Sequence, residues 1–241
     1  MIPFQLQRVS SMPSPVRPQV HPQPRAVRSD GLVTRGQILQ AAGELFAAKG
    51  FERTTSREIC AAAGANLAAV NYHFGGKDAL YDAVLVEAHG QLVGLDDLEA
   101  IRRCGQPLPE QLRALIALFV GRSARPAPWG LRVLVHELMA PSEHVPALIR
   151  QAVLPKVRVI KGLVGELLEL PQDHPGVQRA LALVVLPCVM LVIAPREVLR
   201  QVLPTLAAPP DELVRDMTDY ALAGLASIAR RHRGDRLAPH D

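Results

Sequence analysis

The stretch "GANLAAVNYHFGGKDALY", residues Gly64–Tyr81, combines several polar side chains with a narrow apolar face. Val70 and Phe74 are four residues apart, a spacing that places two side chains on one face of an α-helix. Asn71 and Tyr72 fall on other faces, where a helix of the core would not need polar groups. The pattern predicts a short helix that packs on one side and offers polar groups to a partner on the other.

Two helices are predicted upstream. Residues 34–49 carry apolar residues at helical spacing, with Thr34 as the expected N-cap. A second helix is predicted to start at its N-cap Thr55, with Gly64 ending it in a turn that requires positive φ. Three helices joined in this way form a helix-turn-helix, whose last helix enters the major groove of DNA.

Further helices are predicted beyond the Gly75-Gly76 break, because apolar residues keep helical spacing between prolines. They span residues 77–99, 108–123, 128–139, 144–170 (bent at Pro155), 176–194, 196–206 and 211–232. We therefore predict an all-α fold: a disordered, proline-rich basic arm (1–30), a helix-turn-helix DNA-binding domain (31–80) and a helical ligand-binding and dimerisation domain (81–241).

The basic charge of the chain is concentrated in its first third. Residues 1–80 hold nine Lys and Arg against five Asp and Glu, whereas residues 81–241 hold 18 of each. An asymmetry of this kind suggests that the first segment meets a polyanion. Within it, Asn71 suits paired hydrogen bonds to adenine, and Lys77 beside free backbone N–H groups suits a phosphate.

Motifs for catalysis, metals or cofactors are not found in the sequence. Glu137 follows His136, but Ala140 stands where a zinc protease needs its second His, and the three Cys show no metal-ligand spacing. We predict no enzyme activity, no metal and no cofactor. His144 and His174 lie near prolines and are expected to be exposed in loops.

The most apolar run, Leu181–Pro195, is shorter than a membrane span and is interrupted by Pro187. We expect a helix of the core or of an interface, no membrane association and a cytoplasmic location. Buried thiols at Cys60 and Cys188 fit a reducing compartment.

Residues 34–81 closely resemble the DNA-binding domain of the TetR/AcrR family of transcriptional regulators. The resemblance rests on "ILQAAGELFAAKGFERTTSREICAAAGANLAAVNYHFGGKDALY", whose ending fits Y-x-F-x-x-K-x-x-L. Asn71 stands where many members carry a Tyr. "NLAAVNYHF" and "VLVHELMAPSEHVPALIRQAVLPKV" are similar to the CecR-like branch of that family.

The resemblance implies a homodimer that places two recognition helices in successive major grooves of a palindromic operator. It implies a ligand pocket in the C-terminal domain and dimer contacts through the last long helices, here residues 176–194 and 213–228. The DNA contacts it carries over, together with Asn71, are Thr55, Asn66, Leu67, Ala68, Ala69, Tyr72, His73 and Lys77.

Candidate pocket residues are apolar or adaptable side chains of the C-terminal region. They are Trp129, Leu131, Leu134, His136, Met139 and Met190.

We expect a ligand-responsive regulator, a repressor that a small molecule releases from double-stranded DNA. The alternative is a helical small-molecule-binding protein or enzyme whose helix-turn-helix serves protein contacts.

Overall fold

The computed structural model describes residues 27–207 and 210–237, and over these residues the chain is helical and contains no β-strand. The elements are α1 (Val27–Lys49), α2 (Ser56–Ala63), α3 (Leu67–Phe74), α4 (Lys77–Leu92), α5 (Leu95–Arg103), α6 (Leu108–Ser123), α7 (Trp129–Met139), α8 (Val145–Leu148), the π-helical turn η1 (Ile149–Val153), α9 (Leu154–Leu168), α10 (Pro175–Ile193), α11 (Arg196–Val202), the 3₁₀ turn η2 (Pro204–Ala207) and α12 (Pro210–Leu237). The predicted all-α fold is confirmed.

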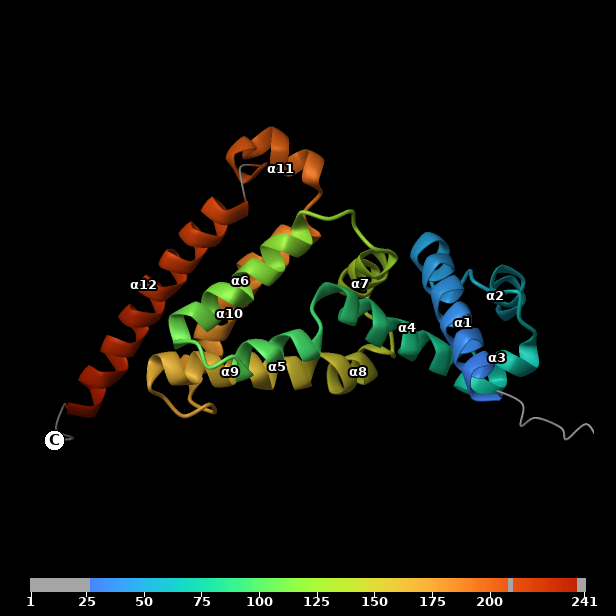
Figure 1. Ribbon diagram of the computed structural model, residues 1–241, viewed down its shortest axis with the longest axis horizontal. Helices are drawn as coiled ribbons and strands as arrows, with labels where there is room; N and C mark the ends of the chain where they lie inside the picture. Colours follow the sequence, from blue (N-terminus) through green and yellow to red (C-terminus); the bar gives the residue numbers. More distant parts are fainter. Residues whose placement is uncertain (1–26, 208–209, 238–241) are drawn as a thin grey trace, which may run out of the picture.

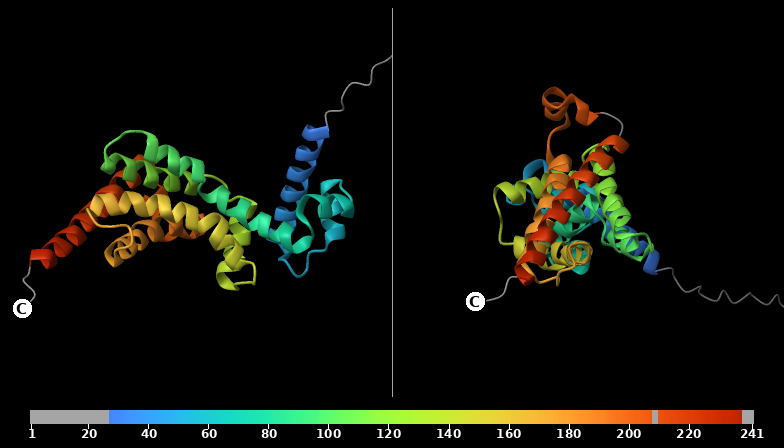
Figure 2. Two further views of the ribbon diagram at one scale, coloured as in Figure 1. Left: turned by 90° about the horizontal axis from the view of Figure 1, so that it is seen from below. Right: turned by 90° about the vertical axis from the view of Figure 1, so that its left-hand side faces the viewer.

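The molecule is elongated, with its first three helices at one end (Figure 1). Helices α1, α2 and α3 form a small unit there, and α12 lies at the opposite end. Helix α4 leaves this unit and runs toward the remaining helices (Figures 1 and 2). Any movement of α4 therefore changes the position of the first three helices relative to the rest.

Two hydrophobic cores hold these parts together. The N-terminal core contains Phe46 of α1, Ile59 of α2, Val70 of α3 and Leu85 of α4, and it also takes in Trp129 of α7. The second core is built from apolar residues of α5, α6, α9, α10 and α12. The first core thus extends past the domain boundary predicted at residue 80, which falls inside α4.

Several predicted helix boundaries differ from the structure. The helix predicted over 196–206 ends at Val202, before the 3₁₀ turn η2, and the last helix runs to Leu237 rather than to residue 232. Helix α1 begins at Val27, so Thr34 lies inside the helix and its prediction as the N-cap is wrong. The last proline before α1 is Pro24, and no residue between Pro24 and Thr34 prevents a helix from forming. This start also overlaps the predicted arm, most of which lies outside the described residues. The predicted fourth helix is divided into α4 and α5 at Val93 and Gly94, where the backbone is extended.

The bend expected at Pro155 takes the form of a π-helical turn. Elements α8, η1 and α9 follow one another without a gap, and Pro155 is the second residue of α9. Proline lacks the N–H for the i→i−4 bond, and the wider turn before it accommodates that loss.

Among the described helices, α10 is long and apolar enough to cross a membrane when judged by length and composition alone. It is longer than the apolar run in the sequence suggested, and Pro187 lies within it. In this fold α10 contacts α6, α9 and α12, and buries Val177, Val184 and Cys188 in the second core. One face of α10 therefore serves the core of a folded protein.

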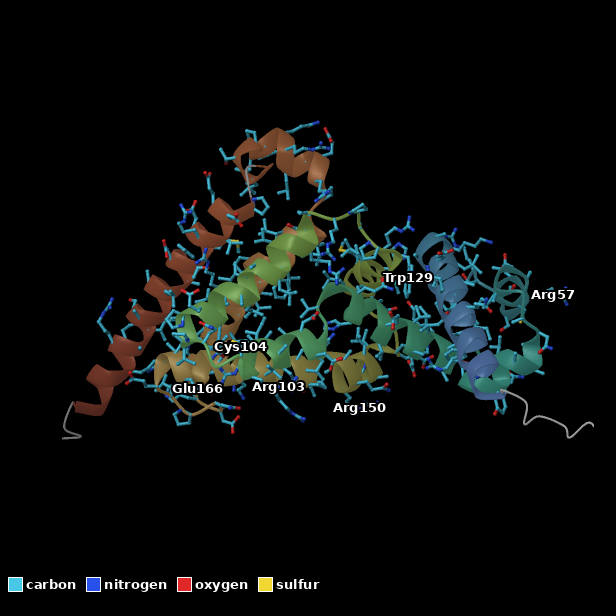
Figure 3. All side chains as sticks on the ribbon, viewed as in Figure 1. Arg57, Arg103, Cys104, Trp129, Arg150 and Glu166 are labelled. Atoms are coloured by element: carbon cyan, nitrogen blue, oxygen red, sulfur yellow. The ribbon has the colours of Figure 1, made fainter. Side chains whose placement is uncertain are left out.

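Helix α7 is fastened to α1 by a close contact between Trp129 and Gly43. A Cβ atom built on Gly43 would lie 2.6 Å from the indole ring, so only glycine lets the ring approach this closely. The indole Nε1 also donates a hydrogen bond to Oε1 of Gln40, at 2.9 Å. Figure 3 shows Trp129 on the side of α7 that faces α1.

We expect Gly43→Ala to destabilise the protein by about 1–3 kcal/mol, because the added methyl group overpacks the contact with Trp129. The matched control is Gly36→Ala in the same helix, where a Cβ meets nothing within 4 Å. That control should stabilise the protein by about 0.5–1 kcal/mol, since alanine favours a helix interior. Chemical denaturation measures both, and equal stabilisation by the two variants would contradict the packing argument.

Candidate nucleic-acid interface

Helix α2 begins with the capping box expected from the sequence. The backbone N–H of Glu58 donates to Oγ1 of Thr55 at 3.3 Å, and the N–H of Thr55 donates back to Oε2 of Glu58 at 2.9 Å. The Lys49 ammonium, 2.6 Å from Glu58, and the bonds from Thr55 lower the pKa of this carboxyl to about 2. The Thr55 side chain therefore holds the start of α2 and is exposed.

The turn from α2 to α3 depends on Gly64, which has a φ of 62° in the left-handed region, as predicted. Asn66 then caps α3, its Oδ1 accepting from the N–H of Ala69 at 2.8 Å. Gly75 ends the helix, and its N–H donates to the carbonyl of Asn71. Both ends of this eight-residue helix are thus fixed by local hydrogen bonds.

Helix α3 packs on one side and lies open on the other. Val70 is fully buried, whereas Leu67 is 54% exposed and Tyr72 is 84% exposed. Asn66, Ala68 and Asn71 are exposed as well, while Ala69 and His73 are half-buried. The structure brings the predicted DNA-contact residues of α3 onto one accessible surface.

Lys77 lies at the start of α4, close to α3. Its Nζ sits 4.1 Å from the centre of the Phe51 ring, a cation–π contact that holds the ammonium at the base of α4. Within residues 27–207 and 210–237, no side chain caps the first turn of α4, which leaves its N–H groups to an anion. This pairing of free N–H groups with a cation is what the sequence predicted for a phosphate site.

Arg57 is a candidate that sequence reasoning did not select. It is exposed on α2, and Figure 3 shows its side chain pointing away from the molecule at the end that carries α3. Its position two residues after the cap of α2 was a usable signal, because a basic side chain at a helix N-terminus suits a phosphate contact.

A buried polar network joins α4 to the loop between α7 and α8. The Tyr81 hydroxyl donates to Oε1 of Glu137 at 2.7 Å, and Oε2 of Glu137 accepts from the N–H and the hydroxyl of Ser142 at 3.0 and 2.8 Å. Burial and the bond to Glu137 raise the pKa of Tyr81 well above its ordinary value, so the phenol stays a donor. This network ties the DNA-binding unit to the C-terminal domain.

His144 extends the same network, and its predicted exposure is wrong. The ring is buried against Phe51 and Tyr81, and its Nδ1 lies 2.8 Å from Oδ1 of Asp82. The flanking prolines suggested a solvated loop, but this loop folds back onto α4. His174, by contrast, is only partly buried and caps α10, its Nδ1 accepting from the N–H of Gly176.

A second buried contact ties α4 to α9 at the other end of α4. Nζ of Lys156 lies 2.7 Å from Nδ1 of His89 and donates to the His89 carbonyl at 3.1 Å. Burial, followed by the nearby Lys156, lowers the pKa of His89 to about 4, and burial lowers that of Lys156 to about 8. At neutral pH His89 is uncharged and accepts this bond.

The six residues predicted to line a ligand pocket do not share one cavity in the described structure. Trp129 belongs to the N-terminal core, and Leu134 packs against that core. Leu131 lines a cavity between α7 and the end of α10. The other three side chains, His136, Met139 and Met190, are exposed. Helical periodicity identified apolar and adaptable side chains but not the face on which each lies.

Among the described residues, no group of three or more His, Cys, Asp or Glu side chains is arranged to hold a metal ion. The free thiols of Cys60 and Cys188 are buried, as expected.

Two families match the chain, in two separate segments. Residues 38–84 match the family described as bacterial regulatory proteins, tetR family. Residues 108–228, half of the chain, match the C-terminal domain of the HTH-type transcriptional dual regulator CecR. The family predicted from the sequence is confirmed.

A curated relative agrees with these families over part of its length. The HTH-type transcriptional dual regulator CecR of Shigella flexneri is 36% identical over 103 residues, which span 42% of this chain and 45% of the relative. The match therefore spans less than half of that relative.

Solved structures share the fold. The fatty acid degradation regulator FadR from Bacillus halodurans superposes with a TM-score of 0.59 at 19% identity, over 80% of this chain and 96% of that one. A TetR-family protein from Mesorhizobium loti gives 0.56 at 18% identity, over 82% and 97% of the two chains. At such identities the likeness concerns the fold alone.

We expect Tyr81→Phe to lower the free energy of unfolding by about 1.5–3 kcal/mol, because it removes a donor from the buried Glu137 carboxylate. The matched control is Tyr72→Phe, because the Tyr72 side chain is 84% exposed. The free energy of unfolding of this variant should equal that of the unmodified protein. Denaturant unfolding measures both, and equal effects would show that the bond to Glu137 contributes nothing to stability.

Proposed function

The chain belongs to the TetR family of bacterial regulatory proteins and carries a C-terminal domain of the CecR type, and on this basis we propose that it is a DNA-binding transcriptional regulator. This is a family of transcriptional regulators rather than of enzymes. We propose that the protein acts as a homodimer in the cytoplasm, binds a palindromic operator, and leaves it when a small molecule binds the C-terminal domain.

The observation that carries the proposal is the exposure of α3. The helix is capped at both ends, anchored through Val70, and accessible over the rest of its surface. A helix with its side chains fits the major groove of B-DNA. Asn71, Leu67 and Ala68 are exposed on this helix. Asn suits paired hydrogen bonds to adenine and small apolar side chains suit contact with thymine methyl groups, which supports base reading by α3.

Phosphate contacts would come from the rim of this surface. These contacts would be made by Thr55 at the start of α2, the exposed Arg57, and Lys77 at the start of α4, and both of these helices contact α3. The rings of Tyr72 and His73 meet edge to face near the end of α3, where a phosphate strand would pass. Such contacts fix register on the duplex, while the bases contacted by α3 supply sequence preference.

The dimer would form through α10 and α12. Leu183, Leu186 and Met190 of α10 and Tyr220 of α12 are each more than 60% exposed. Apolar side chains gathered on one face of two neighbouring helices mark an interaction surface. Two such helices from each subunit would pack as a four-helix bundle.

Repression with release by a ligand is the form of regulation we propose. DNA binding by a dimer requires a set distance between the two α3 helices, and a ligand that prefers another distance shifts the population away from DNA. The Shigella relative is named a dual regulator, so activation of transcription is the alternative to repression. A reporter gene placed behind the operator separates the two by the sign of the change when the protein is removed.

The second candidate function is a helical small-molecule-binding protein whose helix-turn-helix contacts another protein. Sequence-selective duplex binding that weakens steeply as salt rises supports the regulator. Absence of selective binding at any salt concentration would support the second candidate.

We expect Lys77→Ala to weaken binding to all duplexes alike and to reduce the slope of log affinity against log salt by about 1. Asn71→Ala should instead change base preference, costing about 1–3 kcal/mol at one position of the operator. Mobility shifts over a range of salt, with duplexes selected from a random library, measure both. Arg113→Ala on α6 is the control, and unchanged binding in both test variants would mean that α3 does not contact DNA.

We expect Leu186→Glu to convert the dimer to a monomer, because the new carboxylate would be buried without a partner in the interface. The matched control is Leu138→Glu on α7, since the two leucines are 64% and 66% exposed. Sedimentation velocity measures the oligomeric state, and a dimer that survives Leu186→Glu would place the interface elsewhere.

A further inference from the structure

A cavity of about 330 Å³ lies beneath α11, at the end of the second domain where α6 and α10 finish and α12 begins. Figure 1 shows α11 beside the ends of these three helices. The walls of this cavity, here called the α11 cavity, are mostly apolar and include Val120, Leu191 and Leu213. Its volume is at the lower end of the range for small-molecule sites.

A smaller cavity of about 160 Å³, here called the α7 cavity, shares Ser123 and Arg196 with the first. Arg122 and Arg125 also line the α7 cavity, and Arg200 lines the α11 cavity. Among the residues that the structure describes, none that lines either cavity is acidic. The apolar interior of one cavity therefore opens toward a cluster of guanidinium groups.

Three of these arginines have no carboxylate partner among the described residues. Arg196 uses its Nε to donate to the Ser123 carbonyl at 2.7 Å, and Arg122 uses its Nε to donate to the Leu92 carbonyl at 3.3 Å. Both leave their terminal nitrogens available, and Arg125 is exposed at the rim. Of the four arginines, only Arg200 has an acidic partner within the described part of the chain, namely Glu197. Planar guanidinium groups with free donors suit a carboxylate or a phosphate.

We propose that these two cavities bind one small amphipathic anion and that this anion is the effector of the protein. Its charged group would lie against Arg196, which lines both cavities, and its apolar body would fill the α11 cavity. This inference rests on the proposed function, because it names the ligand class to which the regulator responds.

The α7 cavity also touches the connection to the DNA-binding unit. Pro128 and Leu131 line it, and Trp129 between them packs against Gly43 and donates to Gln40 of α1. An anion that draws Arg122 and Arg125 inward pulls on the segment that leads directly into Trp129. Ligand binding would therefore shift α1, and with it α3, relative to the second domain.

The sole tryptophan of the chain is Trp129, so its fluorescence reports on this place. The full chain is titrated separately with sodium octanoate, octyl phosphate and octan-1-ol, which share an apolar chain and differ in charge. We expect a saturable change with at least one anion, and binding of the neutral alcohol to be about tenfold weaker. The two anions show whether the site prefers a carboxylate or a phosphate.

Two arginine variants test the location. Arg196→Gln should weaken anion binding by about tenfold, and Arg125→Gln, which removes an exposed side chain that the fold does not use, should weaken it in the same direction. The control is Arg113→Gln, an exposed arginine near Glu110 on the first half of α6, which should bind the anions like the unmodified chain. No saturable change with either anion, equal affinity for anion and alcohol, or unchanged affinity in both test variants would overturn the proposal.

A mobility shift with and without the anion separates this proposal from the function on which it rests. Selective DNA binding that the bound anion weakens supports both. Selective DNA binding that the bound anion leaves unchanged overturns the effector role. If the fluorescence titration shows anion binding but no duplex is bound selectively, the proposed regulator function is wrong and the proposed anion site is still supported.

Discussion

The packing of Trp129 against Gly43 is the contact that joins the second domain to the DNA-binding unit. It places a residue of the second domain inside the core of the DNA-binding unit, so the two parts share buried surface. The polar bonds from Tyr81 to Glu137 and from Lys156 to His89 fasten α4 at both of its ends. A buried hydrogen-bonding group that loses its partner costs free energy, so intermediate positions of the two domains are unfavourable. The domains are therefore held in discrete arrangements rather than joined by a flexible linker.

This attachment matters because α3 itself has little to hold it. A helix of eight residues is marginal alone, and one that must face outward can bury few side chains. The structure compensates at the ends of α3, with Asn66 as N-cap and Gly75 as C-cap, and through the single buried anchor Val70. Position is therefore supplied by α1, α2 and α4, which in turn take their orientation from the second domain.

Local chemistry made much of this predictable from the sequence. Caps and turns depend on residues a few positions apart, so the capping box at Thr55, the left-handed Gly64 and the outward α3 could all be anticipated. What failed depends on distant contacts. His144 sits between prolines in the sequence, and only the return of its loop onto α4 buries it.

The dependence on distant contacts also explains why the residues predicted for the ligand pocket do not share one cavity. Periodicity assigns a residue to a helix face but does not say which neighbour covers that face, so Trp129 was grouped with ligand contacts although its ring fills the space beside Gly43. The arginines of the α7 and α11 cavities come from α6, the α6–α7 loop and α11, segments up to 78 residues apart that no sequence pattern links.

Helices α10 and α12 connect the two ends of the proposed mechanism. Their exposed apolar faces are the surface assigned to the dimer, and their ends form walls of the α11 cavity. In the proposed dimer, a ligand in that cavity would contact α10 and α12, the helices proposed to join the subunits. On the other side it would meet the segment leading to Trp129. Linkage then requires reciprocity: whatever free energy the ligand contributes against DNA binding, bound DNA contributes equally against the ligand.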